Sequence, residues 1–562
     1  MISRARPSGN GYFGTVYRYW HTIRYLKPVQ IYGRLWFRLR RPAPDLRPAP
    51  ELRKCAGPWV LPARRRPSLM GPGLFRFLNE THELRAGMWD DPALPRLWRY
   101  NLHYFDDLNA QDAVSRRTLH AALLAQWVHE NPPATGSGWE PYPASLRIVN
   151  WIKWALAGNA LPAECVQSLA VQVRHLTRRL EFHLLGNHLF VNAKALVFAG
   201  MFFDGEEAGR WLETGMGILA REIPEQILAD GGQFERSTMY HALAFEDMLD
   251  LINVRRSFVV TVAPEWLELA ARMQDWLAAM CHPDGEIAFF NDAAFGIAPT
   301  PGELGRYAAE LGVGGAGSPG RTLSAGNPAS RAGKRQLLEA SGYARAEADH
   351  AVLIMDVAPI GPDYLPGHAH ADTLSFELSV FGQRVIVNSG TSAYGLGAER
   401  LRQRGTGAHS TVQIDGADSS EVWSGFRVAR RARPVGFTVS EDADVVAMAC
   451  AHDGYRRLPG RPVHRRSWEM TAQGLRVVDS IDGSFREAVA RFHLHPGVKA
   501  SIDQDKGILT LPAGHTMRWS ATGGSVQIVA ATWHPEFGQS IASTCIELAS
   551  SGPQTTMEFS WA

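Results

Sequence analysis

The hydrophobic pattern of this 562-residue chain changes near residues 312–334, and that change limits the folds it can adopt. From about residue 75 to 310, apolar residues recur at helical spacing in segments separated by Gly, Pro or Asn. Beyond residue 334, short alternating runs are bounded by turn residues, which is typical of antiparallel strands. The stretch between them is dense in Gly, Ser, Pro and Ala. The pattern predicts an all-α domain, a helical array or toroid, followed by an antiparallel β-sandwich.

The chain is too long for one simple core, so several parts are expected. They are a basic N-terminal segment (1–70), a helical domain (71–311), a linker (312–336) and a β-sandwich (337–562).

Composition excludes several classes of protein. Hydrophobic content of 45% and charged content of 20% are those of a soluble globular protein. A net charge of +2 argues against a dedicated nucleic-acid binder. The five cysteines are scattered, which indicates neither a disulfide framework nor a thiolate zinc site. No apolar run has the length of a membrane span or the continuity of a signal peptide, so a cytoplasmic location is the default expectation, with membrane-peripheral or periplasmic placement left open.

The N-terminal segment combines many arginines with apolar residues at roughly helical spacing. The apolar positions are Val16, Trp20, Ile23, Leu26, Ile31, Leu35 and Leu39. A basic amphipathic helix of this kind can lie on a membrane surface or bind an acidic partner. The alternative is a helix packed on its own protein with its arginines in solvent.

A polar cluster precedes one alternating run in the β half. His368 and His370 follow a Pro-Gly turn, and residues 373–381 then alternate between apolar and polar side chains. This period predicts a half-buried strand, with both histidines pointing to the same side at its entrance. The alternative is a pair of exposed loop histidines.

A second cluster lies in the helical half, in the sequence Asp230-Gly-Gly-Gln-Phe-Glu235-Arg236-Ser237-Thr-Met-Tyr240-His241. Ser237 is a plausible N-cap, which places Tyr240 in the first turn of a helix. There the positive helix end favours a phenolate, so Tyr240 is a candidate proton-transfer group. The alternative is a core tyrosine with a satisfied hydroxyl.

Two further clusters complete the set. Gly186-Asn187-His188 opens an apolar helix, where Asn187 is the natural N-cap and His188 is its neighbour. Gly407-Ala-His409-Ser-Thr stands before another predicted strand.

The four motifs, in this order, resemble the heparinase II/III family of polysaccharide lyases over roughly residues 100 to 500. That family joins an incomplete α/α toroid to a β-sandwich. The resemblance implies β-elimination at a uronic acid, which requires neutralising a carboxylate, removing the C5 proton and protonating the leaving O4. It implies that Asn187, with His188, holds the carboxylate, that Tyr240 is the acid and a candidate base, and that His368 is the second proton-transfer group. Support and substrate binding would come from Glu235, Arg236, His241, Lys194, Tyr394 and Arg404.

The resemblance also bears on metal binding. In zinc-bearing members the positions corresponding to His370, Asn388 and His409 hold a structural ion. Here the middle position is asparagine, an amide that is a poorer zinc ligand than a carboxylate. The resemblance thus implies one structural zinc or other divalent cation, and the asparagine argues against it.

The leading hypothesis is a lyase that cleaves an anionic, uronate-containing polysaccharide. A glycoside hydrolase would need two opposed carboxylates, for which Asp230, Glu235 and Asp292 are the candidates. A non-catalytic polysaccharide-binding protein in exopolysaccharide biosynthesis is the third hypothesis. The pattern carries no signal for the sugar, the linkage or the oligomeric state.

Overall fold

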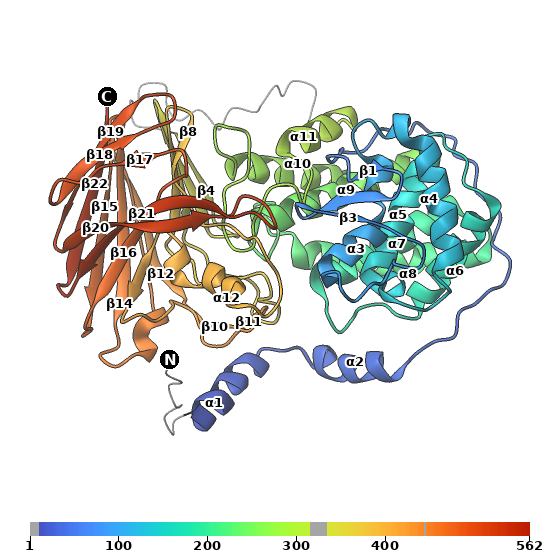
Figure 1. Cartoon of the computed structure of the whole chain (residues 1–562), viewed down its shortest axis with the longest axis horizontal. Coiled ribbons are helices and arrows are strands. Elements are labelled where there is room, and N and C mark those ends of the chain that lie inside the picture. The colour runs from blue at the N-terminus through green and yellow to red at the C-terminus, as the bar shows by residue number, and fades with distance from the viewer. Residues whose placement is uncertain (1–10, 315–333, 443–444) are drawn as a thin grey trace.

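A computed structural model describes residues 11–314, 334–442 and 445–562. Figure 1 shows two domains side by side, one helical and one of β-sheets, with two N-terminal helices along one edge of both. Most of the predicted linker lies outside the described residues. None of the described helices is long and apolar enough to cross a membrane.

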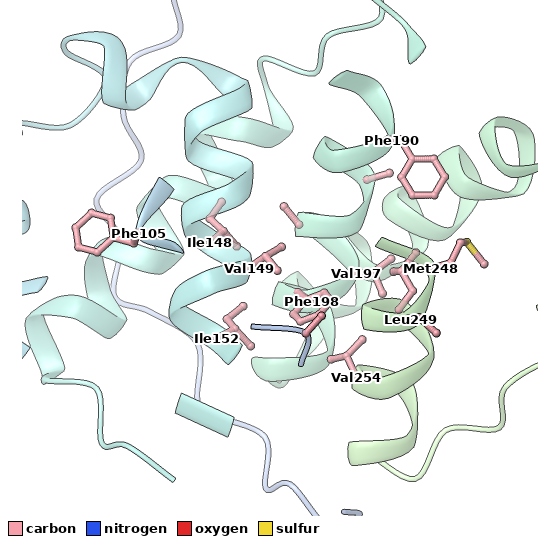
Figure 2. Close-up of a cluster of buried hydrophobic side chains, with 14 of the residues drawn as sticks. Phe105, Ile148, Val149, Ile152, Phe190, Val197, Phe198, Met248, Leu249 and Val254 are labelled. Atoms are coloured by element: carbon pink, nitrogen blue, oxygen red, sulfur yellow. The ribbon is translucent and has the colours of Figure 1, made fainter. Parts of the chain in front are cut away.

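The helical domain packs around one central helix. In α7, fifteen positions are buried, and this helix contacts α5, α8 and α9. Figure 2 shows the side chains between these helices, among them Ile148 and Val149 of α5, Val197 and Phe198 of α7, and Leu249 of α9. The helices of the domain are α3 (Arg96–Tyr104), α4 (Arg117–Glu130), α5 (Pro141–Leu156), α6 (Ala163–Thr177), α7 (Gly186–Phe202), α8 (Glu206–Gln226), α9 (Thr238–Ser257), α10 (Pro264–Ala279) and α11 (Pro301–Glu310).

The helical signal predicted from about residue 75 begins later than expected. A three-stranded antiparallel sheet comes first, formed by β1 (Leu69–Gly71), β2 (Leu74–Phe77) and β3 (Glu80–Glu83). Leu78 and Asn79 join the last two strands, both at positive φ (54° and 62°). A two-residue turn of this handedness favours a hairpin over a helix.

Three antiparallel sheets share one core in the second domain. The five-stranded sheet has the order β4 (Lys334–Leu338), β5 (Tyr343–Ala348), β6 (Ala351–Asp356), β7 (Phe376–Val380) and β8 (Gln383–Ile386). The eight-stranded sheet has the order β12 (Pro434–Asp442), β13 (Val445–His452), β14 (Val463–Thr471), β15 (Gly474–Asp482), β22 (Gln554–Trp561), β19 (Thr516–Thr522), β18 (Lys506–Thr510) and β17 (Lys499–Ala500). The four-stranded sheet has the order β20 (Ser525–Trp533), β21 (Ile541–Ser550), β16 (Ala488–His493) and β9 (Val412–Ile414).

A separate apolar cluster joins the domains. Trp276 of α10 and Met280, the C-cap of that helix, pack with Tyr343 and Ile354 of the five-stranded sheet. β7 is buried along its whole length rather than half-buried as predicted, and its apolar face packs in the core of the β domain. The polar face of β7 meets the helical domain, where Ser379 and Glu377 contact both ring nitrogens of His282 at 2.7 and 2.8 Å.

Candidate active site

Four side chains meet where the helical domain touches the loop between β6 and β7. His368 Nδ1 lies 2.5 Å from Glu235 Oε2. The imidazole stacks on the Tyr240 ring, with centroids 3.7 Å apart and planes at 15°. The Tyr240 hydroxyl lies 3.0 Å from that of Tyr394. The structure thus brings together three residues of the helix-start and His-x-His motifs, and adds Tyr394 from a loop of the β domain.

The start of α9 fixes Tyr240. Ser237 is the N-cap, and its hydroxyl accepts a hydrogen bond from the Tyr240 backbone N–H at 3.1 Å. This confirms the predicted cap and the place of Tyr240 in the first turn. Tyr240 is 9% exposed, so its phenol lies at the edge of the core.

Burial reverses the charge preference predicted for Tyr240. Desolvation, with Tyr394 beside it, raises the pKa of Tyr240 well above its usual value. The helix end does not overcome that effect. Tyr240 is therefore a protonated phenol, suited to donating a proton rather than to acting as a ready-made base.

The two histidines of the His-x-His motif point to different places, contrary to the prediction. His368 faces Glu235 and Tyr240, while His370 Nε2 contacts Asp292 Oδ1 at 2.8 Å. The reason is that residues 368–372 form an irregular loop, not the beginning of a strand. The period of two applies only to extended backbone.

Glu235 is the buried partner that sets the state of His368. Its side chain is 2% exposed and also accepts a hydrogen bond from Gln233 Nε2 at 3.3 Å. A carboxylate on Nδ1 favours the tautomer with hydrogen there, which leaves the Nε2 lone pair free to accept a proton. This arrangement makes Glu235 a positioning residue.

The start of α7 lies beside this cluster. A Cβ placed on Gly186 would come 2.3 Å from Leu365 Cδ2 and 3.8 Å from Glu235 Oε1, so the backbone approaches both closely. Leu185, not Asn187, is the N-cap, and Asn187 is the second residue of the helix. Leu185 takes a positive φ of 62°, and the N-cap therefore lies two residues before the predicted one.

His188 is half-buried, and its surroundings favour the protonated, positively charged imidazole. Burial works to lower its pKa, but the Glu181 carboxylate, 3.2 Å away, outweighs burial and raises the pKa. Tyr142 packs on the ring at 4.6 Å between centroids. Neither Glu181 nor Tyr142 stood out in the sequence, because neither belongs to any of the four motifs.

Lys194 and His241, both predicted to bind substrate, lie in the core instead. The Lys194 ammonium contacts Asp247 and Asp250 at 2.6 and 2.5 Å. His241 accepts the Gln233 N–H at Nδ1 and contacts the Met273 carbonyl from Nε2. Desolvation lowers the pKa of His241 to about 4. These partners occupy the polar atoms of both side chains.

Arg236 and Arg404 also bind the protein itself. Arg236 Nε donates to the Ser341 carbonyl at 2.8 Å. Arg404 is buried and donates from Nε and Nη2 to the Ala369 carbonyl, between the two histidines, at 3.0 and 2.9 Å. The predicted substrate-binding roles of both arginines are not supported by this placement. Arg404 instead holds the loop that carries His368.

The predicted metal ligands assemble only in part. His370 Nδ1 and His409 Nε2 lie 3.2 Å apart. Asn388 Nδ2 donates to the Phe289 carbonyl at 2.9 Å, and its Oδ1 accepts the Ser410 N–H at 3.0 Å. Within the described ranges no cluster of three His, Cys, Asp or Glu residues can hold a metal ion. Protein zinc sites take three or four protein ligands, so this donor set does not fit one, and metal binding stays a prediction.

The carboxylates required for a hydrolase are not presented as an opposed pair. Asp292 is fully buried and binds Arg400 and His370. Asp230 accepts from the Ser341 backbone and hydroxyl at 2.7 and 2.8 Å. Glu235 alone belongs to the cluster, so the geometry does not favour hydrolysis.

Comparison with known proteins agrees with this architecture. The model of the heparinase II/III N-terminus matches residues 110–298, and that of the heparinase II/III-like C-terminal region matches residues 331–562. The chain belongs to the heparinase II/III family. Its fold class is therefore the predicted one, an α/α toroid followed by an antiparallel β-sandwich.

Solved structures of polysaccharide lyases share the fold. A heparinase III, the BT4657 gene product, is 18% identical with a TM-score of 0.62, covering 84% of this chain and 80% of its own. The Streptomyces coelicolor A3 chondroitin AC lyase is 12% identical with a TM-score of 0.54, covering 83% of this chain and 75% of its own.

Curated relatives fall into two kinds. FtsZ-localized protein C of Caulobacter vibrioides is 26% identical over 494 residues, covering 81% of this chain and 80% of the relative. The heparin-sulfate lyase of Pedobacter heparinus is 26% identical over 380 residues, covering 61% of this chain. The chain thus spans about half the length of that lyase, 55%.

Proposed function

We propose that this protein is a polysaccharide lyase that cleaves a uronate-containing anionic polysaccharide by β-elimination. The observation that carries the proposal is the contact of Glu235, His368 and Tyr240, which places a base and an acid side by side. The family and the fold of its lyase members support the same reaction class.

His368 is the base in this scheme. Glu235 holds Nδ1–H, and Nε2 accepts the C5 proton of the uronate. The buried carboxylate stabilises the imidazolium that forms, as in other carboxylate–histidine pairs.

Tyr240 is the acid. Its raised pKa keeps the phenol protonated until the bond from C4 to the leaving oxygen breaks, and the proton then passes to O4. The Tyr394 hydroxyl, 3.0 Å away, can donate to the phenolate left behind. The tight stacking of Tyr240 on His368 keeps acid and base at one sugar ring.

The start of α7 is where the uronate carboxylate would be neutralised. Elimination needs the uronate carboxylate neutralised so that the C5 proton becomes acidic. Asn187 offers an amide in the first turn of α7, where the helix dipole favours an anion. His188, with its raised pKa, adds positive charge next to it.

A second candidate function is polysaccharide binding without cleavage. It is favoured by the match to FtsZ-localized protein C, which covers most of this chain and is not named as a lyase.

The deciding experiment is ultraviolet absorbance during incubation with heparan sulfate, hyaluronan, alginate and glucuronan. Elimination creates a conjugated C4–C5 double bond that hydrolysis does not. We expect a rise in absorbance that disappears in Tyr240→Phe and persists in Tyr455→Phe, whose buried hydroxyl donates to the Val412 carbonyl inside the β domain. Sugar binding with no absorbance on any substrate would favour the second candidate.

A further inference from the structure

The N-terminal helix α2 (Pro28–Leu39) is packed with its apolar side outward. An amphipathic helix normally buries its apolar stripe against the core. In α2 the protein side is formed by Gln30, which is 1% exposed, and by Gly33, which lies against His183. Phe37 adds one ring contact to His183 at 4.2 Å. Val29 packs partly against the core of the helical domain. The exposed large apolar side chains of the helix are Ile31, Tyr32, Leu35, Trp36 and Leu39.

Helix α1 (Gly11–Ile23) repeats this arrangement. Among residues 15–23, whose side chains are described, His21 is buried, while Val16, Trp20 and Ile23 share one helical face and are exposed. Tyr19 meets Trp423 of the β domain edge to face, with ring centroids 4.9 Å apart, and Trp423 Nε1 donates to Thr22. Each helix is therefore anchored to the body of the protein and still presents apolar side chains to solvent.

The charge of the two helices is of one sign. Residues 11–41 contain no Asp or Glu and have seven basic residues, which are Arg18, Arg24, Lys27, Arg34, Arg38, Arg40 and Arg41. Arg34 and Arg38 are exposed and lie beside the apolar face of α2. Tryptophan and tyrosine next to arginine suit the boundary between lipid and water, where rings enter the lipid and the cations reach headgroups.

A second copy of the chain is a poor occupant of this surface. A two-fold contact places the same surface of both copies together. It would bring the arginines of one pair of helices against those of the other, and the segment has no acidic residue to offset them. An anionic bilayer satisfies both the apolar face and the charge.

We propose that α1 and α2 form a membrane-docking arm that binds the protein to bilayers containing anionic lipid. The arm touches the loop that leads to His368. Gln30 Nε2 donates to the Tyr364 carbonyl at 3.1 Å, and the Lys27 ammonium lies 3.8 Å from the centre of the Tyr364 ring. Docking therefore holds the candidate active site close to the bilayer. The proposal does not depend on the lyase reaction.

The test is sedimentation of the full chain with vesicles of phosphatidylcholine, with and without phosphatidylglycerol. We expect binding to the anionic vesicles that weakens at high salt, as electrostatic attraction to lipid requires. A double variant, Leu35→Glu with Trp36→Glu, should reduce the bound fraction about tenfold or more, because it removes two apolar side chains and adds two negative charges. Both positions are exposed, 63% and 61%, so the fold should persist.

Val114→Glu is the matched control, since Val114 is 70% exposed on the helical domain, away from the arm. It should bind vesicles like the wild type, and Arg34→Ala with Arg38→Ala should bind less with an unchanged melting temperature. The proposal is overturned if the wild-type protein stays in the supernatant when anionic vesicles sediment. It is also overturned if the Leu35 and Trp36 variant binds vesicles as well as the control does. It is also overturned if light scattering shows a wild-type dimer that this variant disrupts while no vesicle binding occurs.

Discussion

Tyr240 and His241 are close together in sequence, as are His368 and His370, and in each pair one residue lies at the domain boundary and the other in the core. Tyr240 reaches the boundary, while His241, next in sequence, is sealed between Gln233 and Met273. His368 reaches the boundary, while His370 is sealed among polar partners. Residue type alone therefore does not assign a role. In His241 and His370 both ring nitrogens are engaged by protein groups. In the boundary residues, His368 contacts Glu235 through Nδ1 alone, and the Tyr240 hydroxyl contacts that of Tyr394.

Replacing each histidine by alanine tests this division most strongly. His368→Ala should lower elimination by about 10²–10⁴-fold, the usual effect of losing a general base. Its loss of stability should be the smaller of the two, because the His368 side chain is partly exposed while that of His370 is fully buried. His370→Ala should mainly lower stability, by about 1–3 kcal/mol, because Asp292 and His409 lose a buried hydrogen-bond partner. Initial rates and urea unfolding of both variants give the measurement. Equal stability losses in the two would contradict the division.

Replacing Arg400 tests how much the buried residues of this region contribute to stability. Its guanidinium binds both oxygens of Asp292, and both side chains are buried. Arg400→Met would leave the carboxylate charged and unpaired, which should destabilise the fold by about 3–5 kcal/mol. Arg402→Met is the control, because Arg402 is 44% exposed and pairs with Glu399 on the surface, where about 1 kcal/mol or less is expected. Thermal melts of the two variants should separate clearly.

The pH dependence of stability tests whether His241 is buried. Burial lowers the pKa of His241 to about 4, below the unfolded value of about 6.5. Between these values the unfolded chain binds a proton that the native chain does not, so stability is lost as the pH falls through this window, by up to about 1.4 kcal/mol per unit. His241→Gln cannot titrate and should have a shallower slope between pH 6.5 and 4. Parallel unfolding curves for both proteins would show that His241 is solvated.

The sequence predicted the fold class of a toroid followed by a β-sandwich, the N-cap at Ser237 and the nearness of Tyr240, Glu235 and His368, because each follows from local pattern or from motifs in a familiar order. It did not predict which histidine would face the boundary, since a loop has no fixed period. It assigned Lys194 and Arg404 to the substrate because charge suggested it. Their partners, Asp250 and the Ala369 carbonyl, are distant in sequence, and only the packed chain reveals them.

Asn388 gives the finest test, because it separates a hydrogen-bonding role from a metal-binding one. Its amide donates to the Phe289 carbonyl and accepts from Ser410. Asn388→Asp would place a carboxylate oxygen against that carbonyl, so the metal-free variant should lose about 1–3 kcal/mol of stability. The same change restores a ligand type that zinc prefers, next to His370 and His409. If a metal position remains there, added zinc should raise the melting temperature of Asn388→Asp and leave the wild type unchanged, with metal content measured on the purified proteins. Stoichiometric zinc in the wild type would instead show that the amide is released to the metal, and that the sealed side of the comparison holds a cofactor rather than hydrogen bonds alone.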